Sequence, residues 1–156
     1  MSAAARAGRK NSDDLNRDVY IFLNIVAARY AADVDRVCRE EDLTEAHYRI
    51  LWVLCLADGN DGMTMGAIVD GLVNKAADAT RLVDKLERQG LVRRTPLAED
   101  RRKMIVKVTA AGRRVFARLT PRIKELHTVQ MAGLTGPDKE TLVSLLNSAL
   151  WGYSRP

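Results

Sequence analysis

The side chains whose types and spacing suggest a function are concentrated between Asn74 and Thr109. They are basic residues suited to binding an anion, and they do not form a catalytic set. Arg81 and Lys85 are four positions apart, a spacing that places both on one face of a helix. Residues 101–103, Arg-Arg-Lys, follow in a charged loop between two strand-like runs. A basic helix beside a basic loop can bind phosphates and base edges in two neighbouring grooves of DNA. The pattern therefore predicts a recognition helix followed by a β-wing.

The distribution of charge favours a polyanionic partner. From Lys75 to Arg118 the chain has 13 Lys and Arg against 5 Asp and Glu, whereas the formal net charge of the whole chain is only +5. The flanking residues are therefore negative overall. A basic stripe of this kind attracts DNA, chiefly through release of condensed counterions. A solvated face whose arginines pair with local acids would have the same composition.

Enzymatic and metal-dependent functions have little support in the sequence. It contains no glycine-rich phosphate loop, no GxSxG motif and no Ser/His/Asp set in a distinctive local context. His47 and His127 are the two histidines, and no carboxylate–histidine spacing repeats around them. We therefore expect a protein that is not an enzyme and that uses no metal or other cofactor.

Length and composition fit one helical domain, or one domain with an oligomerisation arm. The 156 residues are 47% hydrophobic but only 5% aromatic, which favours helix-on-helix packing of Leu, Val, Ile and Ala. No apolar run approaches the roughly 20 residues that span a bilayer, and the N-terminal residues lack the apolar core of a signal peptide. With two cysteines and no CxxC spacing, we expect a cytoplasmic protein without disulfides or membrane contact.

Helical periodicity and capping residues predict the first half of the chain. Residues 1–12 are small and polar and predict a disordered tail. Apolar residues at helical spacing predict a long helix over 15–37, which is longer than a small winged domain can cover. Thr44 and Thr64 are suitable N-caps for two further helices, ending near Leu56 and Leu72.

A third helix is expected to begin near Asn74 or Lys75 and to run to Gln89, where Gly90 stops it. Residues 91–95 and 104–108 read as two strands joined by a charged tip.

The C-terminal part predicts two more helices. Thr109 caps the first, and Pro121 inside it should kink or split it. Residues 135–138, Thr-Gly-Pro-Asp, begin the last helix. That helix has a single apolar stripe: Leu142, Leu145, Leu146 and Leu150.

The sequence resembles the MarR family of bacterial winged helix-turn-helix transcription regulators. The residues that carry the resemblance are TRLVDKLERQGLVRR at 80–94, EDRRK at 99–103 and VTAAG at 108–112, and it extends over about residues 15–150. It implies a mainly α fold with a small β-wing. A winged helix-turn-helix lobe would occupy 43–109, and a helical dimerisation region would comprise 13–42 and 110–156.

The resemblance also implies an assembly and an activity. Two chains would form a triangular homodimer whose lobes bind successive major grooves of a pseudo-palindromic operator on double-stranded DNA. The expected function is repression, relieved by a small aromatic or phenolic ligand.

Helix and wing residues are assigned to DNA by the charge pattern and the resemblance together. Asp100 would brace the wing. Lys85 could instead pair with a neighbouring acid such as Asp84 or Glu87. Asp78 could orient an arginine, accept from cytosine or stabilise the helix dipole. The expected DNA-binding residues are Thr64, Asn74, Lys75, Asp78, Thr80, Arg81, Lys85, Arg101, Arg102 and Lys103.

A ligand pocket between the arm and the lobe is implied by the resemblance alone. Its candidate residues are Phe22, Arg29, His47, Tyr48 and Trp52. The spacing of Tyr48 and Trp52 on one helix favours a plainer interpretation, in which both are core residues.

Two other functional classes remain open. Cys38 could sense oxidants, because Arg36 and Arg39 would lower its thiol pKa, whereas Glu40 and Glu41 would oppose them. A structural thiol is the alternative for Cys38, and a core position is expected for Cys55. The chain could also be a winged-helix protein-interaction module, although its basic segment argues against this.

Overall fold

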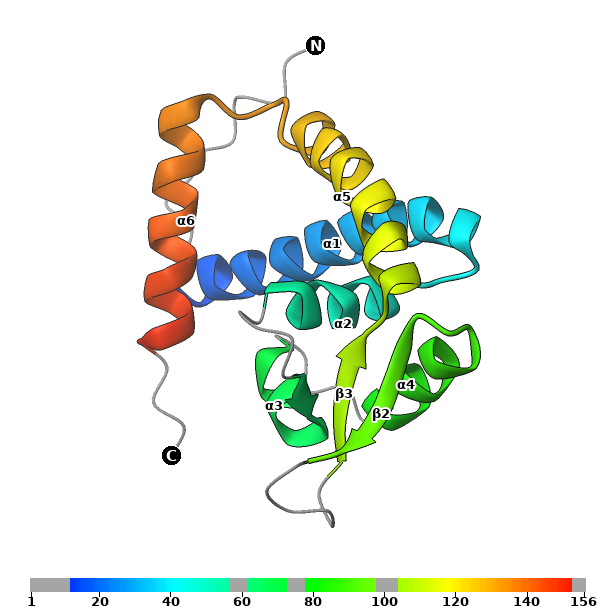
Figure 1. Cartoon of the computed structure of the whole chain (residues 1–156). Helices are drawn as coiled ribbons and strands as arrows, with labels where there is room; N and C mark the ends of the chain where they lie inside the picture. The colour runs from blue at the N-terminus through cyan, green and yellow to red at the C-terminus, as the bar shows by residue number, and fades with distance from the viewer. Residues whose placement is uncertain (1–11, 57–61, 73–77, 98–103, 153–156) are drawn as a thin grey trace.

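The computed structural model describes residues 12–56, 62–72, 78–97 and 104–152 (Figure 1). It is mainly helical with a small antiparallel sheet, which confirms the expected fold class. The elements in chain order are α1 Ser12–Cys38, the 3₁₀ turn η1 Arg39–Glu41, α2 Glu45–Leu56, β1 Met63–Thr64, α3 Met65–Gly71, α4 Ala79–Arg88, β2 Val92–Pro96, β3 Met104–Val108, α5 Ala110–Gln130 and α6 Gly136–Trp151.

Helices α1, α5 and α6 form an arm above a lobe built from α2 to β3 (Figure 1). The arm and the lobe share one core, because α5 packs on both α1 and α2. The hydroxyl of Tyr30 on α1 donates to the backbone carbonyl of Gln130 at the end of α5, at 2.6 Å. None of the described helices is long and apolar enough to cross a membrane.

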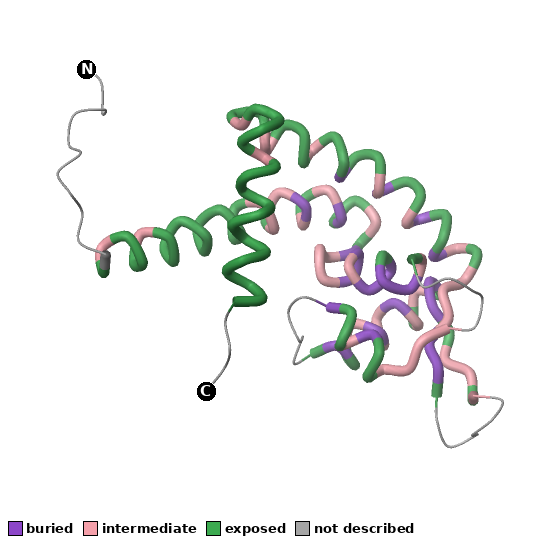
Figure 2. The backbone as a smooth tube through the Cα atoms, turned by 90° about the vertical axis from the view of Figure 1, so that its left-hand side faces the viewer, coloured by how far each residue is buried: buried purple, intermediate pink, exposed green. Residues whose placement is uncertain are grey.

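Burial is confined to the lobe and to the parts of the arm next to it (Figure 2). Ile50, Leu51, Val83, Leu86 and Leu119 are fully buried. By contrast, α6 has no buried residue, and the N-terminal half of α1 exposes a run of large apolar side chains. These two surfaces are what a single copy of the chain leaves uncovered.

Threonines begin three of the helices, as their positions predict. Thr64 Oγ1 accepts from the Ala67 N–H, and Thr109 Oγ1 accepts from the Gly112 N–H. Thr135 and Asp138 form a reciprocal capping box at the start of α6. These contacts are local, and they satisfy backbone N–H groups that the first turn of a helix leaves without partners.

The recognition-helix candidate α4 begins later than its sequence suggests. Asp78 has a non-helical backbone and is the N-cap, so the expected start near Asn74 or Lys75 is wrong. Ala79 is the first residue of α4 that packs on the core. The end agrees with expectation, because Gly90 has φ +68 and its N–H donates to the Glu87 carbonyl at 2.9 Å.

The sheet has the strand order β1-β3-β2, and both pairings are antiparallel. The two expected strands are present, but the short β1, which precedes α3, was not predicted. Pro121 does not split α5, which is continuous from Ala110 to Gln130. Leu119 and Ile123, on either side of the proline, are buried in the same core, which offsets the loss of one backbone hydrogen bond.

Candidate nucleic-acid interface and ligand pocket

The outer face of α4 carries two of the predicted DNA-binding residues. Val83 and Leu86 turn into the core, while Thr80 and Arg81 are exposed. The Arg81 side chain is 83% exposed, and its one ion-pair partner among the described residues is Asp78, with Nη1 3.9 Å from Oδ1. Asp78 makes no side-chain capping bond. Asp78 therefore lies near Arg81, and its role at DNA stays a prediction.

The side chain of Lys85 is less exposed than that of Arg81. Its Nζ lies 3.2 Å from Oδ1 of Asp42, and its side chain is 32% exposed. Neither Asp84 nor Glu87, the acids considered from the sequence, is this partner. Lys85 therefore faces the loop between η1 and α2, and its assignment to DNA stays a prediction.

Arg94 was missed by sequence reasoning, and it joins α4 to the wing. Its Nη2 is 2.6 Å from Asp84, its Nη1 is 2.5 Å from Glu87, and its backbone N–H donates to Glu87 at 2.8 Å. Partial burial lowers the pKa of Arg94, but the hydrogen bonds to both acids raise it above its ordinary value. The guanidinium thus fixes β2 against α4, and two of the five acids in the basic segment, Asp84 and Glu87, make this contact.

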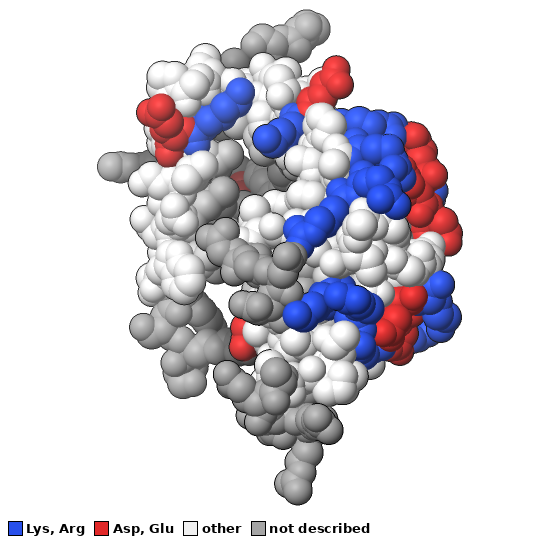
Figure 3. Space-filling model, viewed as in Figure 1, with Lys and Arg blue, Asp and Glu red and all other residues white. Residues whose placement is uncertain are grey.

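The remaining residues assigned to DNA lie at the start of α3 or outside the described residues. Thr64 is half-buried, and its hydroxyl accepts the capping bond of α3, which leaves its own proton available to another acceptor. Figure 3 shows basic side chains gathered over α5 and the wing strands, with acidic side chains along the same edge. Six residues assigned to DNA or to wing bracing lie outside the described residues: Asn74, Lys75, Asp100, Arg101, Arg102 and Lys103.

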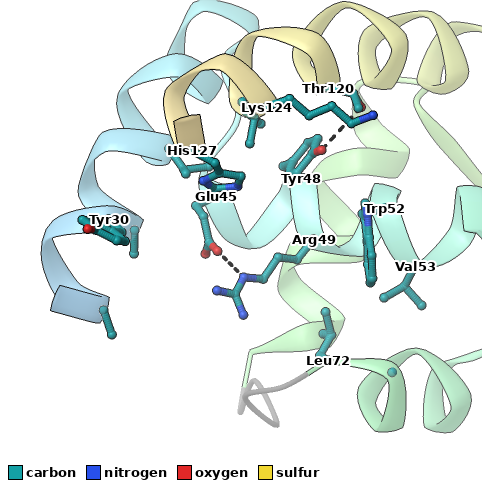
Figure 4. Close-up of a pocket in the computed structure, with 15 residues that line it drawn as sticks. Tyr30, Glu45, Tyr48, Arg49, Trp52, Val53, Leu72, Thr120, Lys124 and His127 are labelled. Atoms are coloured by element: carbon teal, nitrogen blue, oxygen red, sulfur yellow. Dashed lines mark hydrogen bonds and ion pairs between the residues drawn. The ribbon is translucent and has the colours of Figure 1, made fainter. Parts of the chain in front are cut away.

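A cavity of about 610 Å³ lies where α1, α2 and α5 meet the end of α3 (Figure 4). Tyr48 and Trp52 line it, as the resemblance implied. Phe22, Arg29 and His47 are not among its lining residues, and their assignment to a ligand pocket stays a prediction. Phe22 is 63% exposed, and His47 is buried. The lining residues that were not predicted include Tyr30, Glu45, Arg49, Thr120, Lys124 and His127.

The aromatic wall of the cavity consists of Tyr48, which packs against another ring, and Trp52, which is partly exposed. Tyr48 stacks on Phe116 with ring centroids 5.6 Å apart, and its hydroxyl lies 3.4 Å from Thr120 Oγ1. Trp52 is 45% exposed, so its interpretation as a core residue is wrong, whereas Tyr48 is part of the core. The indole therefore presents an uncovered apolar face to the cavity (Figure 4).

Polar groups also line the cavity. Arg49 forms an ion pair with Glu45 one turn earlier, which neutralises it. Within the described chain, no ion-pair partner lies near the Lys124 ammonium, and His127 Nδ1 lies 3.0 Å from Gln130 Oε1. Aromatic side chains and a cation that line the same cavity suit a ring that carries an anionic substituent.

His47 has a structural role at the start of α2. The Thr44 N–H donates to its Nδ1 at 3.1 Å, so the imidazole caps the helix from its first turn. Burial, followed by the charge of Lys85, lowers its pKa. Burial therefore favours the neutral imidazole.

Cys38 does not have the environment of a reactive thiol. It is fully buried, and desolvation, followed by the charges of Asp35 and Glu45, raises its pKa to about 12. Arg39 pairs with Asp35, so it does not stabilise a thiolate. These observations argue against oxidant sensing through Cys38. Cys55 is half-buried rather than in the core, and burial also raises its pKa.

Among the described residues, no group of three or more His, Cys, Asp or Glu side chains could hold a metal ion.

Comparisons with known proteins agree with this geometry. A model of the MarR family matches residues 41–103. The HTH-type transcriptional repressor IacR of Pseudomonas putida is 28% identical over 155 residues, which is 96% of this chain and 89% of that protein.

Solved structures share the fold. A mutant of MarR from E. coli in complex with operator DNA has a TM-score of 0.79 and 22% identity, covering 90% of this chain and 99% of that one. BpsR of Bordetella bronchiseptica, studied for regulation of its DNA binding by 6-hydroxynicotinic acid, has a TM-score of 0.75 and 20% identity, covering 85% and 98%. The family model, the relative that is similar along nearly the whole chain and the shared fold agree, and this chain is similar to transcriptional regulators of the MarR family.

Proposed function

We propose that the protein is a homodimeric repressor whose two α4 helices bind successive major grooves of a pseudo-palindromic operator. The observation that carries the proposal is the exposed Thr80 and Arg81 face of α4, anchored to the wing through Arg94. Arg81 can reach phosphates or base edges without giving up a buried contact. The same activity is supported by IacR, which is named a repressor, and by MarR, which is solved in complex with operator DNA. A DNA-binding role would place the protein in the cytoplasm.

Dimerisation would use residues 13–42 and 110–156, and residues 43–109 would form the DNA-binding lobe. The support for this division is the exposed apolar surface of α6 and of the N-terminal half of α1. A partner chain would bury both surfaces, which the lobe of the same chain does not cover.

Fluorescence anisotropy on labelled duplexes tests the proposed DNA binding. We expect DNA from upstream of the protein's own gene to bind at least about 100-fold more tightly than a scrambled duplex, with affinity falling steeply as salt rises. If neither this DNA nor any duplex from a randomised pool binds more than about tenfold more tightly than random DNA, the regulator proposal fails. Weak, equal binding to all duplexes would favour a protein-interaction module instead.

We also propose that a small aromatic or phenolic acid binds the cavity and releases the DNA. Trp52 and Tyr48 would contact the ring, and Lys124 would face the carboxylate. A ligand that binds better to a lobe position incompatible with the operator lowers DNA affinity by its differential affinity, and DNA lowers ligand affinity by the same factor. The link between 6-hydroxynicotinic acid and DNA binding in BpsR supports a ligand of this kind.

Trp52→Ala should raise the concentration of hydroxybenzoate that is needed to release the DNA at least about tenfold, because the substitution removes one aromatic wall of the cavity. Its affinity for DNA without ligand should be unchanged. Leu56→Ala is the matched control, since Leu56 is also exposed on α2 and does not line the cavity. Equal ligand response in the two variants would remove the cavity from the proposal, and so would a panel of hydroxybenzoates in which none releases DNA.

A further inference from the structure

The segment Arg39–Asp42, between α1 and α2, ends in three consecutive acids, and the first two bind α5. Glu40 accepts from both terminal nitrogens of Arg122, at 2.6 and 2.8 Å. Glu41 accepts from Arg118 through Nε and Nη2, both at 2.8 Å. Figure 3 shows acidic and basic side chains side by side at this edge of the molecule. Two-pronged pairs of this kind define orientation as well as distance.

The third acid binds the recognition helix. Asp42 Oδ1 is 3.2 Å from Lys85 Nζ, and Asp42 Oδ2 accepts from Gln89 Nε2 at 2.9 Å. Lys85 and Gln89 are four residues apart, so one carboxylate holds two successive turns at the C-terminal end of α4. The segment therefore contacts α5 on one side and α4 on the other.

The backbone conformation of Asp42 indicates that its carboxylate has a function beyond closing the turn. Asp42 has φ 54 and ψ 34, and it is the only non-glycine residue with positive φ in the described part of the chain. Its N–H closes the 3₁₀ turn by donating to the Arg39 carbonyl at 3.0 Å. Glycine adopts this left-handed conformation without the steric cost that a Cβ adds. An aspartate here is explained by what its carboxylate binds.

We infer that Glu40, Glu41 and Asp42 are positioning residues for DNA recognition, because they fix the orientation of α4 relative to α5. In the proposed dimer, α5 belongs to the arm that joins the two lobes. The position of α4 on α5 therefore sets the separation of the two recognition helices, which must match the spacing of two grooves. This inference rests on the proposed function.

These contacts suit positioning better than stabilisation. The Asp42 side chain is 81% exposed in its pair with Lys85, and exposed ion pairs add little to the free energy of unfolding. Hydrogen bonds from Arg122 and Arg118 lower the pKa of Glu40 and Glu41, respectively, so both pairs persist at neutral pH. Their removal should then change specificity while the protein stays folded.

Asp42→Gly separates the role of the backbone from that of the carboxylate, since glycine retains the backbone conformation and removes the side chain. The probe is the duplex that the wild-type protein selects from a randomised pool, together with versions whose half-sites are one base pair closer or farther apart. We expect the wild-type preference for the selected spacing to fall about fivefold or more in Asp42→Gly, with Tm unchanged or higher by about 2 °C. Glu40→Gln combined with Glu41→Gln should lose the preference in the same way.

Asp70→Asn is the matched control, because it removes one negative charge from an exposed position on α3 without touching α4. It should retain the spacing preference. Its affinity for random DNA should change by the same small amount as that of Asp42→Gly, because each variant loses one negative charge. Amide hydrogen exchange over residues 82–89 should be faster in Asp42→Gly than in Asp70→Asn, which tests the clamp on α4 without DNA.

Full spacing preference in Asp42→Gly, or in the Glu40 and Glu41 double variant, would overturn the inference while leaving the proposed function intact. Unchanged amide exchange in Asp42→Gly would overturn it too. If the pool yields no preferred duplex, the proposed function itself fails, and the inference fails with it.

Discussion

Replacing Leu146 with glutamate is expected to convert the protein into a monomer and to lower its operator affinity by on the order of a hundredfold or more. Leu146 belongs to the apolar stripe of α6, a helix of 16 residues without a single buried residue in one copy of the chain. An isolated helix of this length is marginal in water, so α6 needs a packing surface. The N-terminal half of α1, with Val19 and Phe22 more than half exposed, is the complementary apolar surface.

A glutamate in that interface would have to be buried as an unpaired charge, which costs several kcal/mol. A monomer would bind one half-site and would lose the gain that comes from linking two binding events. Sedimentation velocity measures the assembly, and anisotropy on the selected duplex measures the affinity.

Ser144→Glu is the control for this experiment. Residues 144 and 146 are two positions apart on α6, so they lie on nearly opposite faces of the helix. Ser144→Glu should remain dimeric with unchanged DNA binding. A Leu146→Glu protein that sediments as a dimer would exclude the leucine stripe from the interface.

Replacing Arg101 and Arg102 together with alanine is the second change with a large expected effect. The two arginines are in the segment that joins β2 to β3, strands that pair from Val92–Val108 to Pro96–Met104. We propose that they enter a narrow minor groove beside the major groove bound by α4, where the negative potential is enhanced. The double variant should bind the selected duplex at least about tenfold more weakly. The slope of log affinity against log salt should decrease by about one for each phosphate that the wing no longer neutralises.

The thermal unfolding of this double variant should match that of the wild-type protein, because the sequence of residues 98–103 is too charged to be expected in a core. Arg36→Ala is a charge control, since Arg36 is an exposed residue of α1 whose partner is Asp33. It should leave the salt slope unchanged. If the wing variant also retains the wild-type slope, the wing does not contact DNA phosphates.

Local signals predicted much of the fold. Thr64, Thr109 and Thr135 begin helices, and Gly90 ends α4, because each contact reaches only a few residues along the chain. Apolar periodicity identified the long α1 and its excess length for the same reason. The start of α4 was misjudged, since Asp78, four residues after Asn74, has a non-helical backbone and is the N-cap.

The cavity was less predictable, because periodicity describes one helix at a time. Tyr48 and Trp52 share a face of α2, yet Tyr48 meets Phe116 from α5 while Trp52 meets open space. Lys124 and His127 reach the cavity because α5 crosses α2 there, an angle that no local pattern encodes. Phe22, on the same long helix as Tyr30, lies too far toward the N-terminus to line it.

The order of the elements, their caps and the basic helix-and-wing pattern could be predicted from the amino-acid sequence, because they depend on neighbours within a few residues. Which charged side chains remain available to bind a partner depends on how the helices pack. Asp42 meets Lys85 and Gln89 across 43 and 47 residues, and Glu40 and Glu41 meet α5 across about 80. An ion pair between groups so distant in the chain exists only after the core has placed their helices side by side, which is why the joint between α5 and the recognition helix is visible in the folded protein alone.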